Sequence, residues 1–455
     1  MTPQFWASSE DASQPIEVAY HNFCGTKSDT KLPSPATIAF CDLQRGIGAN
    51  LEASLGSGRS AFYKNRYHKG IGRTPVVKTW ASEDNLLHSN GLLYPSGALR
   101  EFIFSIFLGE QASQLINPVS NFFLMEGTPY SKQVAEKLYA QFDTVPGHLD
   151  HAFTSQTVKS GDFIRFSNIR YIYNLMGTRF DAPGDAIALA ELLAAIKHGL
   201  HRKPHDAEVI IEPSDLNEII EGIYAAAIQS IKNVIAINML GVKLGSLGNN
   251  FSLDGRFIDL EVPVFTGESM LTTHMGQDQF SISEIFECLG AYFQFSYYLK
   301  DFKTWASRSF NDSTHGQCKE ILSELTQAFS ACDKKYQWLN DPKQVAAFIT
   351  DGYMAHGMQL TKKAQLIIEM AIRNPLMQVS GSGLGAKEEA PIDLAMYQVG
   401  YMPKCHVLTD LAEKSDSVGT WDKAKATNEA LNQSEQCTSP DALFQICNDL
   451  KDSLV

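Results

Sequence analysis

The apolar positions of the chain follow two different periods. Before residue 70, short apolar runs alternate with Gly-x-Gly pairs, which predicts strands at 36–41, 60–63 and 67–69. From Ser96 the spacing becomes helical, and the apolar side chains that share one face are Leu99, Phe102, Ile103, Ile106 and Phe107. We therefore expect a small sheet and one amphipathic helix in this part of the chain.

A long helix is expected from Ser214 to about Leu240. Asp215 and Glu218 have the spacing of a capping box, and Gly241 follows the last turn. The apolar stripe of this helix is wide, which indicates burial inside a lobe. The elements expected after it are a short strand at 256–264, helices at 281–300, 316–335, 342–357 and 360–373, and a flexible loop at 376–390.

Together these elements predict an α+β protein with two lobes. Residues 1–35 are polar and form an expected leader, and residues 36–130 form a small β-rich N-lobe with one long helix. Residues 131–400 form a larger, mainly helical C-lobe. Residues 401–455 carry only weak helical patterns and are expected to be a C-terminal extension.

The composition is that of a packed globular protein, because 44% of the 455 residues are hydrophobic and 20% are charged. The 38 basic and 51 acidic residues give a net charge of −13, which argues against a nucleic-acid partner. No apolar run is long enough to cross a membrane, and the first twenty residues contain no signal-peptide core. The eight cysteines have no metal-binding spacing and are expected to be reduced and mostly buried. These features predict a cytoplasmic protein.

Two glycine pairs lie between the expected strands. They are Gly46 with Gly48, and Gly56 with Gly58, and Arg59 follows the second pair directly. Glycines let the backbone come close to a phosphate, which free N–H groups can then bind. The same pairs are also typical of plain hairpin turns, so both interpretations stay open here.

Two charged residues near the expected sheet are candidates for a binding site. Lys69 ends a strand and begins the string Lys-Gly-Ile-Gly-Arg-Thr-Pro, which also contains Arg73. Two cations beside a tight turn can hold an anion, although a solvated surface lysine gives the same pattern. Glu101 adjoins apolar positions of the helix, where a buried carboxylate needs a partner. An exposed glutamate at the edge of the apolar stripe is the alternative.

Asn250 and Asp259 lie nine positions apart (259 − 250), on either side of an Asp-Gly pair. An amide oxygen and a carboxylate that meet in space can share Mg²⁺, which prefers oxygen ligands. Taken alone, this pattern is more typical of a hairpin turn.

In their order along the chain, these motifs resemble the selenoprotein O family, whose members have a protein-kinase fold and transfer AMP rather than phosphate. The matching segments are Lys69–Pro75, Arg100–Phe102, Phe163–Phe166, and the pair Asn250 and Asp259. The resemblance covers about residues 45–265. It implies a bilobal protein-kinase-like fold that binds ATP, with the α-phosphate open to attack, together with Mg²⁺.

The resemblance also implies roles for individual residues. Lys69 would hold the nucleotide phosphates and Glu101 would orient Lys69. Arg165 would contact the terminal phosphate, and Asn250 and Asp259 would coordinate Mg²⁺. The two glycine pairs and the arginines at 59 and 73 complete the expected nucleotide site. Nucleotidyl transfer needs this combination of charge neutralisation and positioning.

Several features depart from the family pattern, and two of them concern residues of the expected site. The first phosphate-binding arginine of the family falls on Val158, with Lys159 as the only nearby substitute. The catalytic aspartate expected directly before Asn250 is Asn249, and an amide cannot accept a proton from a hydroxyl group.

Asn249 leaves three functions to consider. The leading one is transfer of AMP to a protein or peptide acceptor, which can be a carboxylate because that group is already ionised at neutral pH. The string at 69–75 is also similar to proteins of bacterial siderophore-microcin maturation, in which a peptide carboxyl terminus is modified. The alternatives are a nucleotide-binding pseudokinase scaffold for a peptide- or protein-modifying partner chain, and a protein kinase, which the missing His-Arg-Asp loop disfavours.

Overall fold

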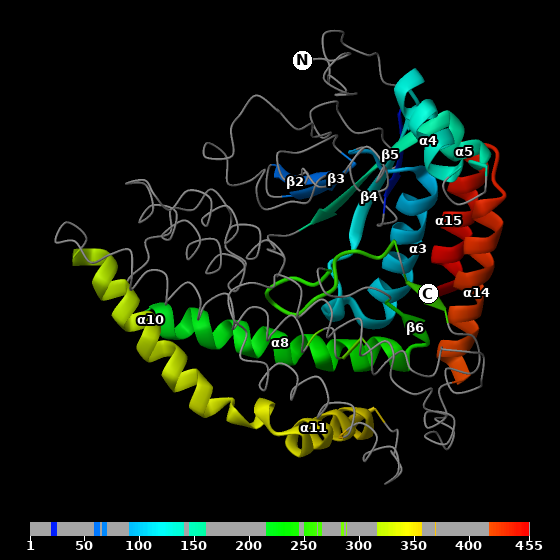
Figure 1. Cartoon of the computed structure of the whole chain (residues 1–455). Helices are drawn as coiled ribbons and strands as arrows, with labels where there is room; N and C mark the ends of the chain where they lie inside the picture. The colour runs from blue at the N-terminus through cyan, green and yellow to red at the C-terminus, as the bar shows by residue number, and fades with distance from the viewer. Residues whose placement is uncertain are drawn as a thin grey trace.

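The structure is a computed structural model, and it describes these residues of the chain: 20–24, 59–63, 66–70, 91–140, 145–160, 215–244, 250–261, 263–265, 284–285, 288, 316–356, 369 and 418–454. Helices predominate and strands form one main sheet (Figure 1). The expected α+β class is confirmed.

The main sheet has five antiparallel strands in the order β1-β4-β5-β3-β2. Its strands are β1 (Tyr20–Cys24), β2 (Ser60–Tyr63), β3 (Arg66–Lys69), β4 (Val119–Glu126) and β5 (Phe153–Ser160). The strands expected at 60–63 and 67–69 are therefore present and form a hairpin.

Two strands lie outside the range expected for the sheet. β1 falls inside the expected leader at 1–35, and β5 falls inside the expected helical lobe at 131–400. Both pair with β4, along the whole of β1 and from Phe153 to Lys159 of β5. Pairing between segments so distant in sequence depends on the partner strand, so a local pattern did not reveal it.

The β2–β3 hairpin depends on Gly70. Its φ of +90° is one that residues with a side chain rarely adopt, and its N–H donates to the carbonyl of Arg59 at 2.8 Å. A Cβ at this position would lie 2.4 Å from the carbonyl oxygen of Ser155 in β5. Glycine therefore lets the end of β3 approach β5 and keeps Arg59 beside Lys69.

The helix expected after Ser96 is α3 (Pro95–Ala112), which packs on β4 and β5. Its first turn has no side-chain cap from Tyr94; instead, Asp150 accepts hydrogen bonds from the backbone N–H and the hydroxyl of Ser96, at 2.8 and 2.6 Å. Asp150 belongs to α5 (His148–Ala152), which follows α4 (Pro129–Ala140). A 3₁₀ turn, η2 (Ser113–Leu115), ends α3.

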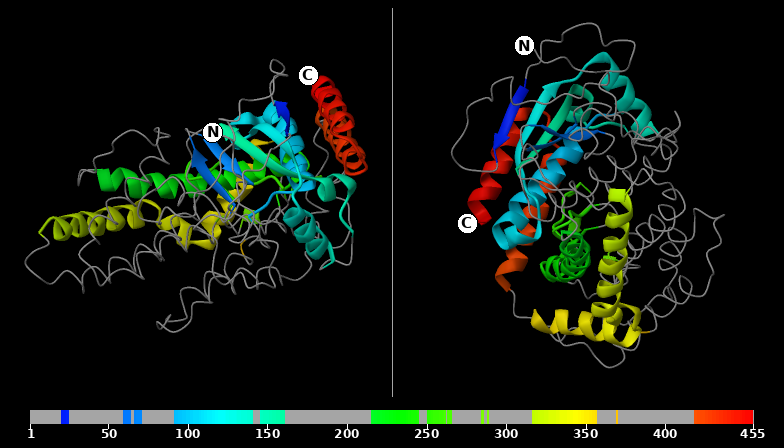
Figure 2. Two further views of the ribbon diagram at one scale, coloured as in Figure 1. Left: turned by 90° about the horizontal axis from the view of Figure 1, so that it is seen from above. Right: turned by 90° about the vertical axis from the view of Figure 1, so that its left-hand side faces the viewer.

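A second group of helices packs below the sheet in the view of Figure 1. It contains α8 (Asp215–Met239), α10 (Gly316–Lys335), η3 (Gln337–Asn340) and α11 (Pro342–Ala355). Three of the expected helices are thereby confirmed, those at 214–240, 316–335 and 342–357. Figure 2 shows α8 and α10 lying side by side.

The strand expected at 256–264 is wrong for most of its length. Around Gly255, whose φ is +82°, the chain makes a tight turn, and Phe251 and Phe257 form an isolated antiparallel bridge across it. Regular pairing returns only in β7 (Val264–Phe265), which pairs with β6 (Val242–Lys243). Phe257, Ile258 and Leu260 are buried, so irregular backbone with buried apolar side chains produced the strand-like pattern.

The C-terminal extension folds onto the core rather than standing apart from it. It forms α14 (Val418–Glu435) and α15 (Pro440–Leu454), which pack against each other and against α3 (Figures 1 and 2). Leu443, Cys447 and Leu450 of α15 are buried and belong to the same hydrophobic cluster as α3 and α8.

Several expectations lie wholly or largely outside the described residues: the strand at 36–41, the helices at 281–300 and 360–373, and the loop at 376–390. In the described part of the chain, no helix combines the length and apolar character needed to span a membrane. The described cysteines at 288, 332 and 447 are buried, and Cys437 is partly buried.

Candidate functional site

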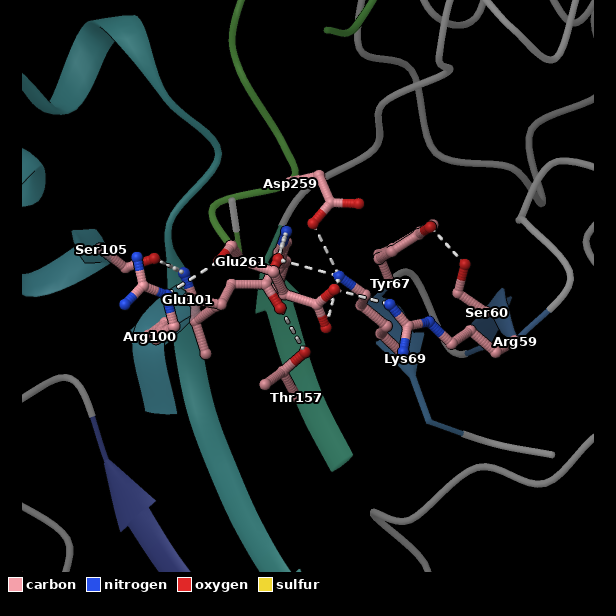
Figure 3. A network of polar contacts seen from close by, with 12 residues as sticks. Arg59, Ser60, Tyr67, Lys69, Arg100, Glu101, Ser105, Thr157, Asp259 and Glu261 are labelled. Atoms are coloured by element: carbon pink, nitrogen blue, oxygen red, sulfur yellow. Dashed lines mark hydrogen bonds and ion pairs between the residues drawn. The ribbon is translucent and has the colours of Figure 1, made fainter. Parts of the chain in front are cut away.

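Lys69 lies at the meeting point of three segments of the chain. Its side chain is 1% exposed, and its Nζ lies 2.8 Å from Oδ1 of Asp259 and 3.2 Å from Oε1 of Glu261. Oε1 of Glu101 is 3.6 Å away (Figure 3). The interpretation of Lys69 as a solvated surface lysine is therefore wrong, because a buried ammonium group here is surrounded by carboxylates.

The pleat of the sheet brings the polar side chains together. Tyr67 and Lys69 are two residues apart on β3, and their partners on β5 are Lys159 and Thr157. Alternate residues of a strand share one face, so these four side chains point to the same side, which α3 covers. Glu101 reaches this face from α3.

Glu101 is completely buried and has three polar partners. Oε1 lies 2.5 Å from Nζ of Lys159, and Oε2 accepts a hydrogen bond from the hydroxyl of Thr157 at 3.0 Å. Burial alone would raise the pKa of Glu101, but Lys159 and Lys69 outweigh it and lower the pKa below its ordinary value. The alternative of an exposed glutamate at the edge of the helix is wrong.

Lys159, which was the possible substitute for a phosphate-binding arginine, is directed at Glu101 instead. Its side chain is fully buried, and its Nζ lies 6.0 Å from the centre of the Tyr67 ring. Burial lowers the pKa of Lys159 more than Glu101 raises it. No alternation marked this position in the sequence, because Thr154 and Gln156 on the other face of the strand are polar and buried as well.

Asp259 reaches Lys69 because its segment is anchored to the residues that join α3 to β4. The backbone N–H of Phe257 donates to the carbonyl of Leu115, and the carbonyl of Phe257 accepts from Asn117. The N–H of Ile258 donates to the carbonyl of Asn250 at 3.0 Å. The main chain therefore brings Asn250 beside the residue that precedes Asp259.

Glu261 was not among the residues expected from the sequence. Its Oε2 lies 2.6 Å from Nη2 of Arg59, and its carbonyl accepts a hydrogen bond from Nε of Arg100 at 3.1 Å. Arg100 also donates to the carbonyl of Pro263 at 2.6 Å. The only sequence signal was a second acidic residue two positions after Asp259, in a segment expected to be a strand.

The charges of this network balance. Three cations, Arg59, Lys69 and Lys159, face three carboxylates. Burial alone would lower the pKa of Lys69, but Asp259, Glu101 and Glu261 raise it above its ordinary value, so Lys69 carries its charge at neutral pH. Arg59 likewise has a raised pKa, since its neighbouring carboxylates outweigh the effect of burial.

The carboxylates of this site are already paired with cations, Asp259 and Glu261 with Lys69, and Glu101 with Lys159. Within the described ranges, no group of three or more His, Cys, Asp or Glu side chains is arranged to hold a metal ion. Mg²⁺ is usually bound by one or two carboxylates together with substrate phosphates. A metal ion at Asp259 would compete with Lys69, because Oδ1 of Asp259 lies 2.8 Å from Nζ of Lys69.

The remaining site residues expected from the sequence lie outside the described residues: Gly46, Gly48, Gly56, Gly58, Arg73, Arg165 and Asn249. Of the others, the structure brings Arg59, Lys69, Glu101 and Asp259 into one network.

Comparisons of the chain with protein-family models, with curated proteins and with solved structures found no match. A function for the chain therefore has to come from the geometry of the site and from its motifs.

Proposed function

We propose that the protein binds ATP with Mg²⁺ at the Lys69 network and transfers AMP to a protein or peptide acceptor. The observation that carries this proposal is the convergence of Lys69 with Glu101 and Asp259, which come from a strand, a helix and a later loop. Kinase-fold enzymes use a strand lysine paired with a helix glutamate to hold phosphates, and a later aspartate to hold the metal ion.

The order of elements supports a bilobal kinase-like plan. Helix α3 connects β3, which carries Lys69, to β4, and β5 lies between these two strands in the sheet. The segment with Asp259 and the long helix α8 come later in the chain (Figure 1), and Phe257 of that segment hydrogen bonds with Leu115 and Asn117, which follow α3. This arrangement brings the Lys69–Glu101 pair to Asp259, the residue that the proposal assigns to the metal ion.

In the proposed reaction, an oxygen of the acceptor attacks the α-phosphorus. The bond from that phosphorus to the oxygen bridging to the β-phosphate breaks, and pyrophosphate leaves. Lys69 stabilises negative charge on the phosphates, while Glu101 keeps Lys69 in place. Mg²⁺, when bound at Asp259, would neutralise the charge that develops on the leaving group.

Asn249 favours an acceptor that needs no deprotonation. A carboxylate is ionised at neutral pH, and its attack on the α-phosphorus gives a mixed anhydride, an acyl-adenylate. A hydroxyl acceptor would need a base, which an asparagine cannot supply.

A nucleotide-binding scaffold is the second candidate. It is favoured by the short contact of 2.8 Å between Lys69 and Asp259, since an aspartate that already neutralises Lys69 is less available to a metal ion. Such a protein would bind nucleotide without turning it over, and its nucleotide-bound form would bind a modifying partner chain.

Incubation with α-labelled and γ-labelled ATP in the presence of Mg²⁺ separates the candidates. Peptides with free or amidated carboxyl termini serve as acceptors, and hydroxylamine distinguishes an acyl-adenylate, which it cleaves, from a phosphoester, which it leaves intact. We expect label from the α-position only, lost in Lys69→Met and Asp259→Asn. The matched controls are Lys335→Met on α10 and Asp351→Asn on α11, which lie on exposed surface.

Label from the γ-position would instead indicate a kinase. Nucleotide binding without transfer would favour the scaffold. Binding that does not depend on Lys69 would overturn the proposed site.

A further inference from the structure

The carboxylate of Glu261 lies between two cations of the β2–β3 hairpin. Oε2 is 2.6 Å from Nη2 of Arg59, and Oε1 is 3.2 Å from Nζ of Lys69. The two cations are held side by side, because Arg59 begins the hairpin, Lys69 ends it, and Gly70 bonds back to Arg59. Figure 3 shows the carboxylate directed at both.

Such a pair of cations forms a subsite for an anion. A buried ammonium group is costly unless a negative partner is present, and Lys69 is almost completely buried. A carboxylate presents two oxygens to the two cations, as a phosphoryl group does.

We infer that Glu261 fills the subsite of one phosphoryl group of the nucleotide, and that the nucleotide must displace the Glu261 side chain in order to bind. This inference rests on the proposed function. The Glu261 carboxylate then competes with the nucleotide for Arg59 and Lys69. The affinity for nucleotide therefore depends partly on how strongly these two cations bind Glu261.

The side chain of Glu261 can leave without unfolding its segment. Arg100 holds the backbone carbonyl of Glu261 and that of Pro263, so the main chain stays in place when the side chain turns away. Oε1 of Glu261 is buried but accepts no hydrogen bond, and the side chain is 17% exposed at the edge of the network. Release to water gives up the hydrogen bond from Arg59 and the ion pair with Lys69, which the phosphates of the nucleotide would replace.

The glutamate and a phosphoryl group cannot share the subsite, because like charges at contact distance repel strongly in a partly buried site. Removing the charge of Glu261 leaves Arg59 without its carboxylate and Lys69 with one carboxylate fewer, and it removes that repulsion. Asp259 and Glu101 still accompany Lys69, so the lysine keeps a partner in the variant.

The test measures binding of three probes by isothermal titration calorimetry: ATP with Mg²⁺, tripolyphosphate and adenosine. For Glu261→Gln we expect the affinity for ATP and for tripolyphosphate to rise about tenfold or more. A hydrogen bond to a charged group contributes a free energy that corresponds to about this factor in affinity. Adenosine should bind as it does to the wild type. Glu435→Gln is the matched control, because Glu435 pairs with Arg100 but not with Arg59 or Lys69.

Glu261→Asp is the second variant, and thermal unfolding checks that each variant is folded. The shorter side chain keeps its charge but cannot span both cations, so ATP affinity should rise by a smaller factor. Unchanged or weaker binding of ATP in the folded variants overturns the inference while the proposed function stands. An equal rise for adenosine also overturns it. Absence of ATP binding to the wild type and to both variants overturns the proposed function together with the inference.

Discussion

Glu101 lies closer to Lys159 than to Lys69. The distance from its Oε1 is 2.5 Å to Nζ of Lys159 and 3.6 Å to Nζ of Lys69. Lys69 in turn has its shortest contact with Asp259. The carboxylate on α3 is thus shared between two strands, and Lys159 fixes it in a position from which it can also face Lys69.

Removing Lys159 should destabilise the protein strongly. In Lys159→Met, Glu101 keeps Lys69 but loses its nearest partner, and breaking a buried ion pair from one side costs about 3–5 kcal/mol. Urea unfolding measures this loss. Lys137→Met on the exposed face of α4 is the control and should change stability by less than about 0.5 kcal/mol. A Lys159→Met protein as stable as the control would show that the pair contributes nothing.

Stability should also fall in acid because of Glu101. Its pKa is lowered in the folded protein, so the carboxylate stabilises the fold fully above its unfolded value of 4.5 and loses this effect as the pH falls through the lower folded value. The free energy of unfolding, measured from pH 6 to pH 3, should decline more steeply for the wild type than for Glu101→Gln. The exposed Glu136 on α4 serves as the control position, and Glu136→Gln should keep the wild-type slope. Equal slopes for wild type and Glu101→Gln would contradict the expectation.

Two glycine substitutions should have opposite effects. Gly70→Ala places a Cβ 2.4 Å from the carbonyl oxygen of Ser155 at a φ of +90°, so we expect a loss of about 1–3 kcal/mol or more. Gly109→Ala lies within α3 with nothing within 4 Å of the added Cβ, and should gain up to about 1 kcal/mol from helix propensity. Thermal and urea unfolding of both variants tests the pair. Similar behaviour of the two would show that the β2–β3 hairpin does not require glycine at residue 70.

The C-terminal hairpin of α14 and α15 should be part of the same cooperative unit as α3. Leu450→Ala in α15 removes a buried side chain and should cost about 2–5 kcal/mol, whereas Gln445→Ala on the exposed face of α15 should be nearly neutral. Hydrogen exchange should report faster exchange along α3 in Leu450→Ala, because α3 packs against both helices and Lys451 lies over Phe102. Faster exchange confined to α14 and α15 would indicate a separate unit.

Local pattern was enough to locate the helices that bury one clear apolar face. The start expected for α3 and the ranges expected for α8, α10 and α11 agree with the structure to within a few residues. The 3.6-residue period of an amphipathic helix can be recognised within one continuous stretch of sequence. The charged residues at 69, 101 and 259 were singled out by the motifs around them and by the order of those motifs along the chain, not by periodicity.

The other partners of those residues were decided by the tertiary structure. Lys159 and Thr157 reach Glu101 only because β5 pairs with β3 in one register, and Glu261 reaches Arg59 only because the turn at Gly255 is anchored to the end of α3. The placement of β1 in the sheet and of α15 against α3 has the same origin. The register of strand pairing and the packing of distant segments depend on which surfaces meet when the chain folds. The free energy of such a contact depends on both surfaces, so neither stretch of sequence determines it by itself.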